Sequence, residues 1–299
     1  MSNKISVVIN TLNESKVLKR ALESVKWVDE IVVVDMHSED DSLKIAKEYN
    51  AKTFLHKRLS FVEPARNFAV SKASNDWILV LDPDEEVIDS LRERLVEIAS
   101  KMEQIDYVRI PRKNLIFGGW MHASMWWPDY NIRFFRKGKV EWSNKIHRSP
   151  DVSGEGIDLS ADEKWAIIHH HYESISQFME RMERYTKVQA MELYEDGYKF
   201  TWHDLIRKPV SEFLSRFFAN RGFEDGLHGL ALSLLQAFSF IIVYLKVWEI
   251  EKFNPQVITL QELKQLSSDS GKEIEYWFKN ANLSNNTFKR FFQKVRNNL

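Results

Sequence analysis

The sequence predicts an α/β fold built on a mostly parallel sheet, and two observations lead to this prediction. Short apolar runs alternate with helix-like segments through the first ~100 of the 299 residues. The runs end in polar, often acidic residues, as strands do where they reach an open edge of a sheet. Strands separated by helices require right-handed crossovers, which make neighbouring strands parallel. Parallel sheets bind ligands beyond the carboxyl ends of their strands, so a site is expected there.

The elements of the first part can be assigned in order. Strands are predicted at 5–9, 30–35, 51–55 and 77–81, where apolar residues are continuous. Helices are predicted around 17–25, 43–49 and 63–73, and Pro64 must then lie in the first turn of the last one. Four strands with three helices between them are typical of one α/β domain.

The second part has a different pattern. From about residue 107 the chain is rich in aromatic and β-branched residues, with turn signals at Gly118, Gly119, Pro128 and Gly138, which predicts β-hairpins or irregular strands. From residue 176 the apolar spacing becomes helical. We therefore expect a first domain over 1–175, with halves at 1–105 and 106–175, and a helical region over 176–299.

Composition excludes several classes of protein. The net charge of −1 leaves no overall footprint for binding nucleic acid. The absence of cysteine excludes disulfides, thiolate catalysis and cysteine-type zinc sites. Neither G-x-G-x-x-G after the first strand nor a P-loop occurs, which argues against dehydrogenases and P-loop NTPases. The N-terminus lacks the apolar core of a signal peptide, so a cytoplasmic setting is expected.

The segment DPDEE, which follows the strand at 77–81, is the strongest chemical signal. Asp82 and Asp84 are two positions apart, so in an extended segment they point the same way, roughly 6.5 Å apart. Oxygen ligands of this kind suit Mg²⁺ or Mn²⁺, with a nucleoside diphosphate completing the shell. Alternatively, Asp84, Glu85 and Glu86 only favour the start of a following helix. The position after a buried strand favours the metal site for Asp82 and Asp84, while Glu85 and Glu86 are assigned to the start of the following helix.

The order of three motifs resembles glycosyltransferase family 2, whose members are inverting enzymes with the GT-A fold. The motifs are SVVINTLNE, VVVDMHSEDDS and ARNFAVSKASNDWILVLDPDEE, within residues 4–90. The continuation, to about residue 190, looks like the bacterial branch that adds core sugars to lipopolysaccharide. The resemblance implies that 1–105 binds the nucleotide and that 106–175 forms the acceptor side.

The resemblance also implies roles for individual residues. Asp35 would accept a hydrogen bond from the base, Asp82 would face the ribose and the metal ion, and Asp84 would bind the metal. The other expected nucleotide-sugar contacts are Thr11, Asn13, Glu14 and Arg66. A metal ion and an arginine both offset the charge of a leaving diphosphate. Bland alternatives remain: Asn13 as a helix cap, Asp35 as a turn residue and Arg66 as a solvated helix residue.

The acceptor half offers two candidates for the base that inverting transfer requires. Asp129, in WWPDY, is the first choice, although it could be only a turn residue after Pro128. His147 is the second, since a neutral histidine is a competent base near pH 7. Related sequences often carry an acid after this histidine, and Arg148 stands there instead.

Further residues of this half are assigned to the acceptor or the metal. Trp126 and Trp127 either stack on sugars or form a packed loop. Arg133 and Arg136 lie on opposite faces of a strand, so one of them points into the site, and Arg133 is assigned to the acceptor side. His169 is favoured as a metal ligand, with His171 on the same face of its strand. In addition, Glu85 could line the acceptor side.

The helical region suggests a membrane surface or a homo-oligomer interface. Basic residues and phenylalanines precede an uncharged stretch at 227–245, long enough to test as a membrane span. His228, Gly229, Ser233 and Gln236 weaken that interpretation.

Taken together, the sequence predicts a Mg²⁺- or Mn²⁺-dependent inverting glycosyltransferase, peripheral on the cytoplasmic face of the membrane. It would transfer sugar from a nucleotide donor, a UDP-sugar first, to a lipid-linked or lipopolysaccharide-core glycan. Two alternatives stay open, a polyprenyl-phosphate glycosyltransferase and a non-catalytic scaffold that binds nucleotide sugars or membranes.

Overall fold

The computed structural model describes residues 3–59, 62–143 and 149–280. It divides into two compact units, each treated separately below. The first comprises Met1–Met121 and Trp126–Ile175, and the second comprises His122–Met125 and Ser176–Leu299. We call them the sheet unit and the helical unit.

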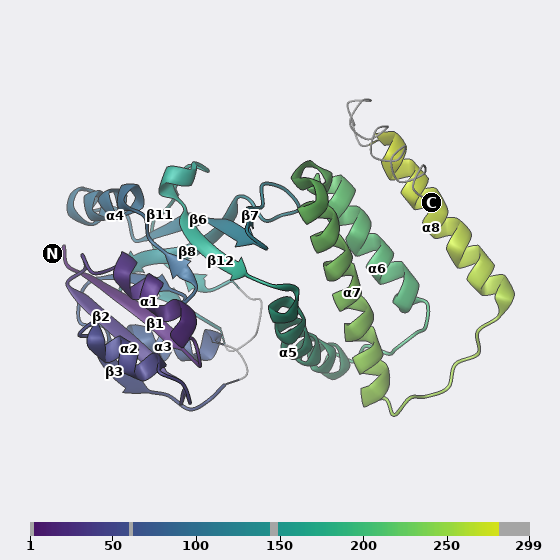
Figure 1. The fold of residues 1–299 in the computed structure, drawn as a ribbon, viewed down its shortest axis with the longest axis horizontal. Coiled ribbons are helices and arrows are strands. Elements are labelled where there is room, and N and C mark those ends of the chain that lie inside the picture. The colour runs from purple at the N-terminus through teal and green to yellow at the C-terminus, as the bar shows by residue number, and fades with distance from the viewer. Residues whose placement is uncertain (1–2, 60–61, 144–148, 281–299) are drawn as a thin grey trace. The chain divides into compact units, whose positions relative to one another are not determined.

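The sheet unit begins with alternating strands and helices (Figure 1). These are β1 Ile5–Thr11, α1 Ser15–Ser24, β2 Glu30–Asp35, α2 Ser42–Glu48, β3 Lys52–Leu55, α3 Glu63–Lys72, β4 Trp77–Leu81, β5 Glu85–Glu86 and α4 Asp89–Lys101. The chain continues mainly in strands: β6 Tyr107–Ile116, β7 Gly119–Trp120, β8 Asp129–Arg136, β9 Val140–Glu141, β10 Asp151–Val152, β11 Gly156–Asp158, the short helix η1 Glu163–Trp165 and β12 Ile167–Tyr172.

The main sheet has the strand order β3-β2-β1-β4-β8-β6-β12-β5 within the described residues. β3, β2, β1 and β4 are parallel to one another, whereas β8 runs antiparallel to both β4 and β6. The parallel part therefore places the carboxyl ends of β1, β2 and β4 at one edge. The antiparallel part matches the hairpins expected after residue 107.

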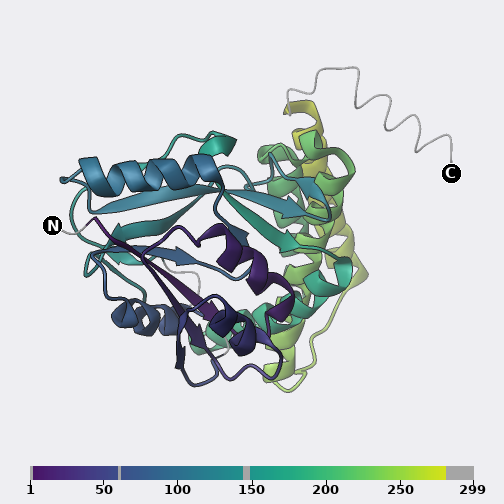
Figure 2. The same cartoon turned by 60° about the vertical axis from the view of Figure 1, so that its left-hand side comes forward.

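Helices cover both faces of the parallel strands, because residues alternate along each strand. Val7, Ile9 and Leu79 pack with α1 and α4 in one apolar cluster, through residues such as Leu22 and Leu95. Val8, Val32, Val34 and Val80 face α3 in a second cluster. Figure 2 shows α4 running along its face of the sheet. The predicted α/β class is confirmed.

One local prediction is wrong. Glu85 and Glu86 do not begin a helix, because they form the short strand β5, which pairs antiparallel with β12. The next helix, α4, begins only at Asp89. Pairing with β12 pulls the acidic segment into the sheet, and this is a non-local contact that composition cannot reveal.

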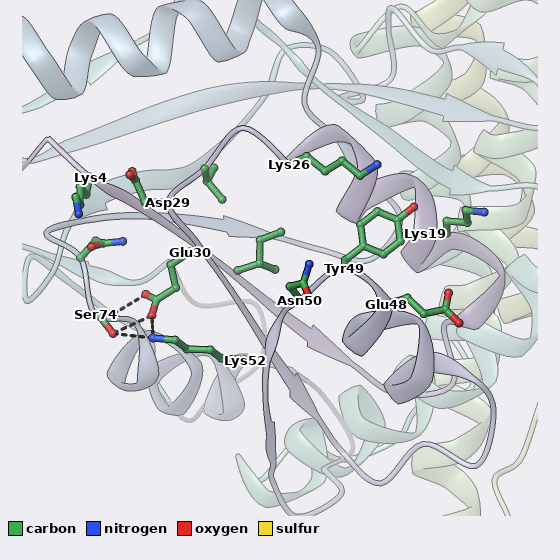
Figure 3. Close-up of a pocket in the computed structure, with 13 residues that line it drawn as sticks. Lys4, Lys19, Lys26, Asp29, Glu30, Glu48, Tyr49, Asn50, Lys52 and Ser74 are labelled. Carbon is green, nitrogen blue, oxygen red and sulfur yellow. Dashed lines mark hydrogen bonds and ion pairs between the residues drawn. The ribbon is translucent and has the colours of Figure 1, made fainter.

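The opposite edge of the sheet carries a hollow of about 810 Å³, and the buried carboxylate of Glu30 lies beside it (Figure 3). The Glu30 carboxylate accepts hydrogen bonds from the hydroxyls of Ser6 (2.5 Å) and Ser74 (2.8 Å) and from Lys52 Nζ (2.6 Å). Burial opposes the charged form of Glu30, but the hydrogen bonds outweigh it and lower its pKa to about 2. Glu30 therefore ties β1, β3 and the turn before β4 together at their amino ends.

The helical unit contains α5 Ile175–Glu195, α6 Asp204–Leu214, η2 Ser215–Ala219, η3 Gly222–Asp225, α7 Gly226–Ile250 and α8 Leu260–Asn280. α6 and α7 pack together, and Gly229 lets the backbone of Gly222 come close, because a Cβ there would meet Gly222 O at 1.7 Å. Within the described residues, one helical segment, Gly222–Ile250, has the length and composition of a membrane span, with a mean hydropathy of 2.0. The core helix of a soluble protein can have the same length and composition.

Candidate active site

Polar side chains follow β1, β2 and β4 where these strands end at the same edge of the sheet. Thr11 and Asp35 are direct neighbours in the register of β1 and β2. Ile9 pairs with Leu81, so Asp82 follows one position beyond, beside Asn10. The edge where parallel sheets bind ligands therefore carries two carboxylates and a hydroxyl.

Two buried oxygen atoms at this edge have no hydrogen-bond partner among the described residues. Asp35 Oδ2 accepts the backbone N–H of Ser38 at 3.0 Å, but Asp35 Oδ1 is buried without a hydrogen bond. Thr11 Oγ1 is in the same situation. Buried polar atoms are nearly always hydrogen-bonded, so this pair is suited to a ligand that brings its own donors.

Asn13 is not the helix cap that was considered as an alternative. The residue before α1 is Glu14, which makes no capping bond from its side chain. Asn13 instead has a positive φ of 58°, and its Oδ1 accepts the N–H of Glu39 at 2.7 Å. Asn13 therefore links the loops after β1 and β2, and the backbone N–H of Glu14 donates to Ser42 Oγ at 2.9 Å in the same junction.

Asp82 lies between two arginines. Its Oδ1 accepts from Arg66 at 2.7 Å, and its Oδ2 accepts from Arg133 at 2.5 Å. Burial raises the pKa of Asp82, but the charges of Arg133 and Arg66 outweigh it and hold the pKa well below its usual range. Both oxygens of Asp82 are thus engaged, while Arg66 Nε is buried without a hydrogen-bond partner in the described part of the chain.

Glu85 and Arg133 form a buried ion pair next to Asp82. The Glu85 side chain has no exposed surface, and its Oε1 accepts from Arg133 Nη2 at 2.6 Å. Arg133 is 2% exposed, and neighbouring charges raise its pKa despite its burial. Side chains enclosed in this way cannot touch an acceptor, so the structure contradicts the acceptor-side role predicted for both. Arg136 instead donates to the backbone oxygen of Ile105.

Asp84 and His169 are the residues best placed to share a cation. His169 lies on β12 opposite Glu85 of β5, and this register brings its Nε2 to 3.6 Å from Asp84 Oδ2. No group of three or more His, Asp or Glu side chains in the described parts of the chain could hold a metal ion alone. The two ligands fit a Mg²⁺ or Mn²⁺ ion that takes its remaining ligands from a diphosphate and water.

Asp129, the first candidate for the base, is held in a different setting. Its Oδ2 accepts from Arg112 Nη2 at 2.6 Å and from Asn114 Nδ2 at 3.1 Å, and its Oδ1 accepts from Asn131 at 3.0 Å. Burial raises its pKa, but Arg112 and Asn114 outweigh this and lower it. A carboxylate held ionised in this way is a weak base, so the geometry favours a structural role.

The aromatic residues of the acceptor half contact the histidines and one another. The ring of Trp126 lies 5.4 Å from that of His171, and Trp127 meets Trp120 edge to face at 5.2 Å. Both tryptophans are half-buried, so the packed-loop alternative describes their present contacts. His171 and His169 share a face, as expected for alternating strand residues, while His170 turns to Glu86.

Sequence reasoning missed two residues, Arg112 and Asn114. Arg112 and Asn114 share a face of β6 and reach Asp129, and Asn114 also reaches His169. Their period-two spacing was a usable signal, because two polar residues on an otherwise apolar face of a strand need partners. The other candidate base, His147, lies outside the described residues.

Comparisons with known proteins agree with this architecture. The sequence model described as Glycosyl transferase family 2 matches residues 6–153. An uncharacterised glycosyltransferase of Rickettsia typhi is 32% identical over 266 residues, which cover 85% of this chain and 90% of the relative. The lipopolysaccharide core biosynthesis glycosyltransferase LpsC of Rhizobium meliloti is 24% identical, over 82% of this chain and 92% of its own.

A solved structure is similar at a lower level. Glucosyl-3-phosphoglycerate synthase from Mycobacterium tuberculosis, solved with Mn²⁺, uridine diphosphate and glucosyl-3-phosphoglycerate, is 16% identical. The match covers 66% of this chain and 81% of the synthase, with a TM-score of 0.41. At this level of similarity, the ligands of the synthase are facts about that protein alone.

Proposed function

The chain belongs to glycosyltransferase family 2, and on this premise we propose that it is a metal-assisted inverting enzyme that transfers a sugar from a nucleotide donor to a lipid-linked or lipopolysaccharide-core glycan. Its GT-A fold and glycosyltransferase activity follow from membership of the family. The observation that supports the finer proposal best is the set of polar groups beyond β1, β2 and β4, where two buried oxygens lack partners and Asp84 faces His169.

The nucleotide would bind at the ends of β1 and β2. Asp35 Oδ1 can accept an N–H of the base, and Thr11 Oγ1 lies beside it in the sheet register. Asn13 and Glu14 shape the loop next to them. We propose a uridine nucleotide first, because uracil offers one ring N–H to a single accepting oxygen.

The diphosphate would bind between β4 and β12. Asp84 and His169 would hold the divalent cation, which as a Lewis acid offsets the charge of the leaving diphosphate. Arg66 keeps an unpartnered Nε after pairing with Asp82, so it can donate to a phosphate oxygen. We propose that Asp82 orients Arg66 and faces the ribose, with a metal contact only if the arginines release one of its oxygens.

Inversion requires the acceptor hydroxyl to attack the anomeric carbon from the side opposite the diphosphate, while a base removes its proton. We favour His147 for this base, since Asp129 is held by Arg112 and Asn131. Trp126 and Trp127 stay candidates for contact with acceptor sugars. A His147→Ala variant should lower kcat by a larger factor than it changes KM. An unchanged kcat would exclude His147 as the base.

The acceptor proposal is supported by the lipopolysaccharide core role in the name of one relative and by the helical unit. Leu227, Leu234 and Phe238 lie on one side of α7 and are exposed. Arg207 and Lys208 of α6 are exposed as well, whereas Arg216 pairs with Glu212. Exposed apolar and basic groups suit peripheral contact with an anionic membrane on its cytoplasmic face.

Transfer assays with and without Mn²⁺ test the proposal. Asp84→Asn should lower turnover about 100-fold or more, because it removes a charged ligand from the cation. Asp89→Asn is the matched control, since Asp89 is an exposed acid at the start of α4 with an 85% exposed side chain. Turnover of Asp84→Asn equal to that of the control would refute the metal role. An acceptor screen with lipopolysaccharide-core glycans and polyprenyl phosphate distinguishes the two acceptor classes.

The nucleotide is tested separately by thermal unfolding. A bound nucleotide stabilises the folded state, so UDP, GDP, ADP and CMP, each with Mn²⁺, are compared for the shift in Tm. UDP should give the largest shift. A larger shift with another nucleotide would reassign the base but leave the transferase proposal standing.

A further inference from the structure

Asn114 makes contacts that the proposed reaction has not yet used. It lies on β6 without exposed surface, between Asp129, the Trp126 backbone and the imidazole of His169. We propose that Asn114 is a positioning residue that keeps the hydrogen of His169 on Nδ1, so that the lone pair of Nε2 faces Asp84. This inference rests on the metal site of the proposed function.

The contacts of Asn114 decide which way its amide points. Its Nδ2 lies 2.8 Å from the backbone oxygen of Trp126 and 3.1 Å from Asp129 Oδ2. A carbonyl oxygen and an ionised carboxylate only accept hydrogen bonds, so the NH₂ group must face both. The amide oxygen of Asn114 is therefore the atom directed at His169.

The amide oxygen in turn decides the tautomer of His169. Asn114 Oδ1 lies 2.6 Å from His169 Nδ1, and an amide oxygen can only accept, so Nδ1 carries the hydrogen. In the neutral ring, Nε2 then has a lone pair. His171 Nδ1 lies 3.2 Å from His169 Nε2, so it can donate a hydrogen bond to this lone pair, and a bound cation would take the place of that hydrogen bond.

Asp129 prevents the amide of Asn114 from reversing. Arg112 donates to Asp129 Oδ2 through Nε at 2.9 Å and Nη2 at 2.6 Å, which keeps this carboxylate ionised and oriented. A reversed Asn114 would place its oxygen against that carboxylate and leave the Trp126 oxygen without a donor. The successive hydrogen bonds that join Arg112, Asp129, Asn114 and His169 thus fix which ring nitrogen of His169 carries the hydrogen.

The direction matters because Nε2 of His169 lies 3.6 Å from Asp84 Oδ2. With a lone pair on Nε2, two electron-pair donors face a common position that a cation can occupy. With the hydrogen on Nε2, this hydrogen would occupy that position instead. Removing a residue that orients a metal-binding histidine in this way usually lowers metal affinity 10- to 100-fold.

Two measurements on the full chain test the inference. Histidine ¹H–¹⁵N correlation spectra of the metal-free protein report which ring nitrogen carries the hydrogen, and His169→Gln identifies the signals. Calorimetry gives the affinity for Mn²⁺ in the presence of UDP. Asn131→Ala is the matched control, because Asn131 also donates to Asp129 but makes no hydrogen bond to His169.

We expect the hydrogen on Nδ1 of His169 in the wild type and in Asn131→Ala. Asn114→Ala should populate the Nε2–H tautomer and weaken Mn²⁺ binding at least about tenfold. A wild-type ring with its hydrogen on Nε2 would overturn the inference, and this result requires no variant to fold. An Asn114→Ala protein with unchanged tautomer and affinity would overturn it as well.

Mn²⁺ binding by the variants distinguishes a failure of the proposed metal site from a failure of the Asn114 role. If Asp84→Asn and His169→Gln bind Mn²⁺ as the wild type does, the metal site itself is wrong, whatever the tautomer. If both lose Mn²⁺ while Asn114→Ala retains it, the metal site stands and only the positioning role of Asn114 is refuted.

Discussion

Replacing Arg133 with methionine should destabilise the sheet unit by about 3 kcal/mol. Arg133 Nη2 bridges Asp82 and Glu85 at 2.5 and 2.6 Å, and both Arg133 and Glu85 are buried. Removing one member of a buried ion pair typically costs about 3–5 kcal/mol, because the remaining charge has no compensation. The lower end applies here, since Asp82 keeps Arg66 at 2.7 Å and Glu85 keeps Arg112 at 3.4 Å.

Urea unfolding measures the effect, and Arg109→Met is the control. Arg109 also lies in the sheet unit and pairs with Asp158 through two nitrogen atoms, but both side chains are nearly half exposed. Exposed ion pairs contribute about 0–1 kcal/mol, so the control should lose less than 1 kcal/mol. The same loss for both variants would refute the conclusion that burial makes Arg133 essential.

A second substitution separates charge from packing. If the loss in Arg133→Met comes from the uncompensated carboxylate of Glu85, Arg133→Met combined with Glu85→Gln should recover part of it. The recovery is an interaction energy from a double-mutant cycle, and values of about 1–3 kcal/mol are expected for residues in contact. A double variant that simply adds the two single losses would show that packing, not charge, dominates.

Three further predictions concern separate parts of the molecule. The pKa of Glu30 falls from 4.5 to about 2 on folding, so the stability that it provides is present above about pH 4.5 and is lost as the pH falls toward 2. In Glu30→Gln this acid-dependent component, about 3 kcal/mol, should disappear from the unfolding free energies measured in urea across pH 2–6. Gly229→Ala should destabilise the helical unit by more than about 2 kcal/mol, because the added Cβ would meet Gly222 O. The control, Gly271→Ala in α8, adds a Cβ that meets nothing within 4 Å and should stabilise by about 0.5–1 kcal/mol. Equal effects of the two variants in thermal unfolding would contradict this prediction. Asp35→Asn should weaken nucleotide binding about tenfold or more in calorimetry, since an amide can present its NH₂ to the N–H of the base, and unchanged affinity would remove Asp35 from the base site.

The regular elements of the sheet unit were predictable because their signals are local. The strands 30–35 and 77–81 agree with β2 and β4 in both bounds, since continuous apolar runs between polar residues leave little choice. The convergence of Asp35 and Asp82 at one edge also followed from the sequence. Parallel strands joined by crossovers must end on the same side, whatever their exact packing.

The partners of the site residues were not predictable in the same way. Arg133 reaches Asp82 across 51 positions, and His169 reaches Asn114 across 55. These contacts depend on the registers of β8 with β4 and of β12 with β6, which no local pattern encodes. The alternation along β8 predicted that one of Arg133 and Arg136 would point inward, but not that Arg133 would pair with Asp82 and Glu85 instead of facing an acceptor.

By itself, the sequence determined that this protein alternates strands and helices, where its polar strand ends lie and which family it resembles, because these depend on residue type and spacing along the chain. The tertiary structure decided what each of those polar residues does. Glu85 became a buried partner of Arg133, Asp129 an anchor for Asn114, and Asp84 the neighbour of His169. The physical reason is that a carboxylate acts through the charges and donors around it, and folding supplies these from distant strands.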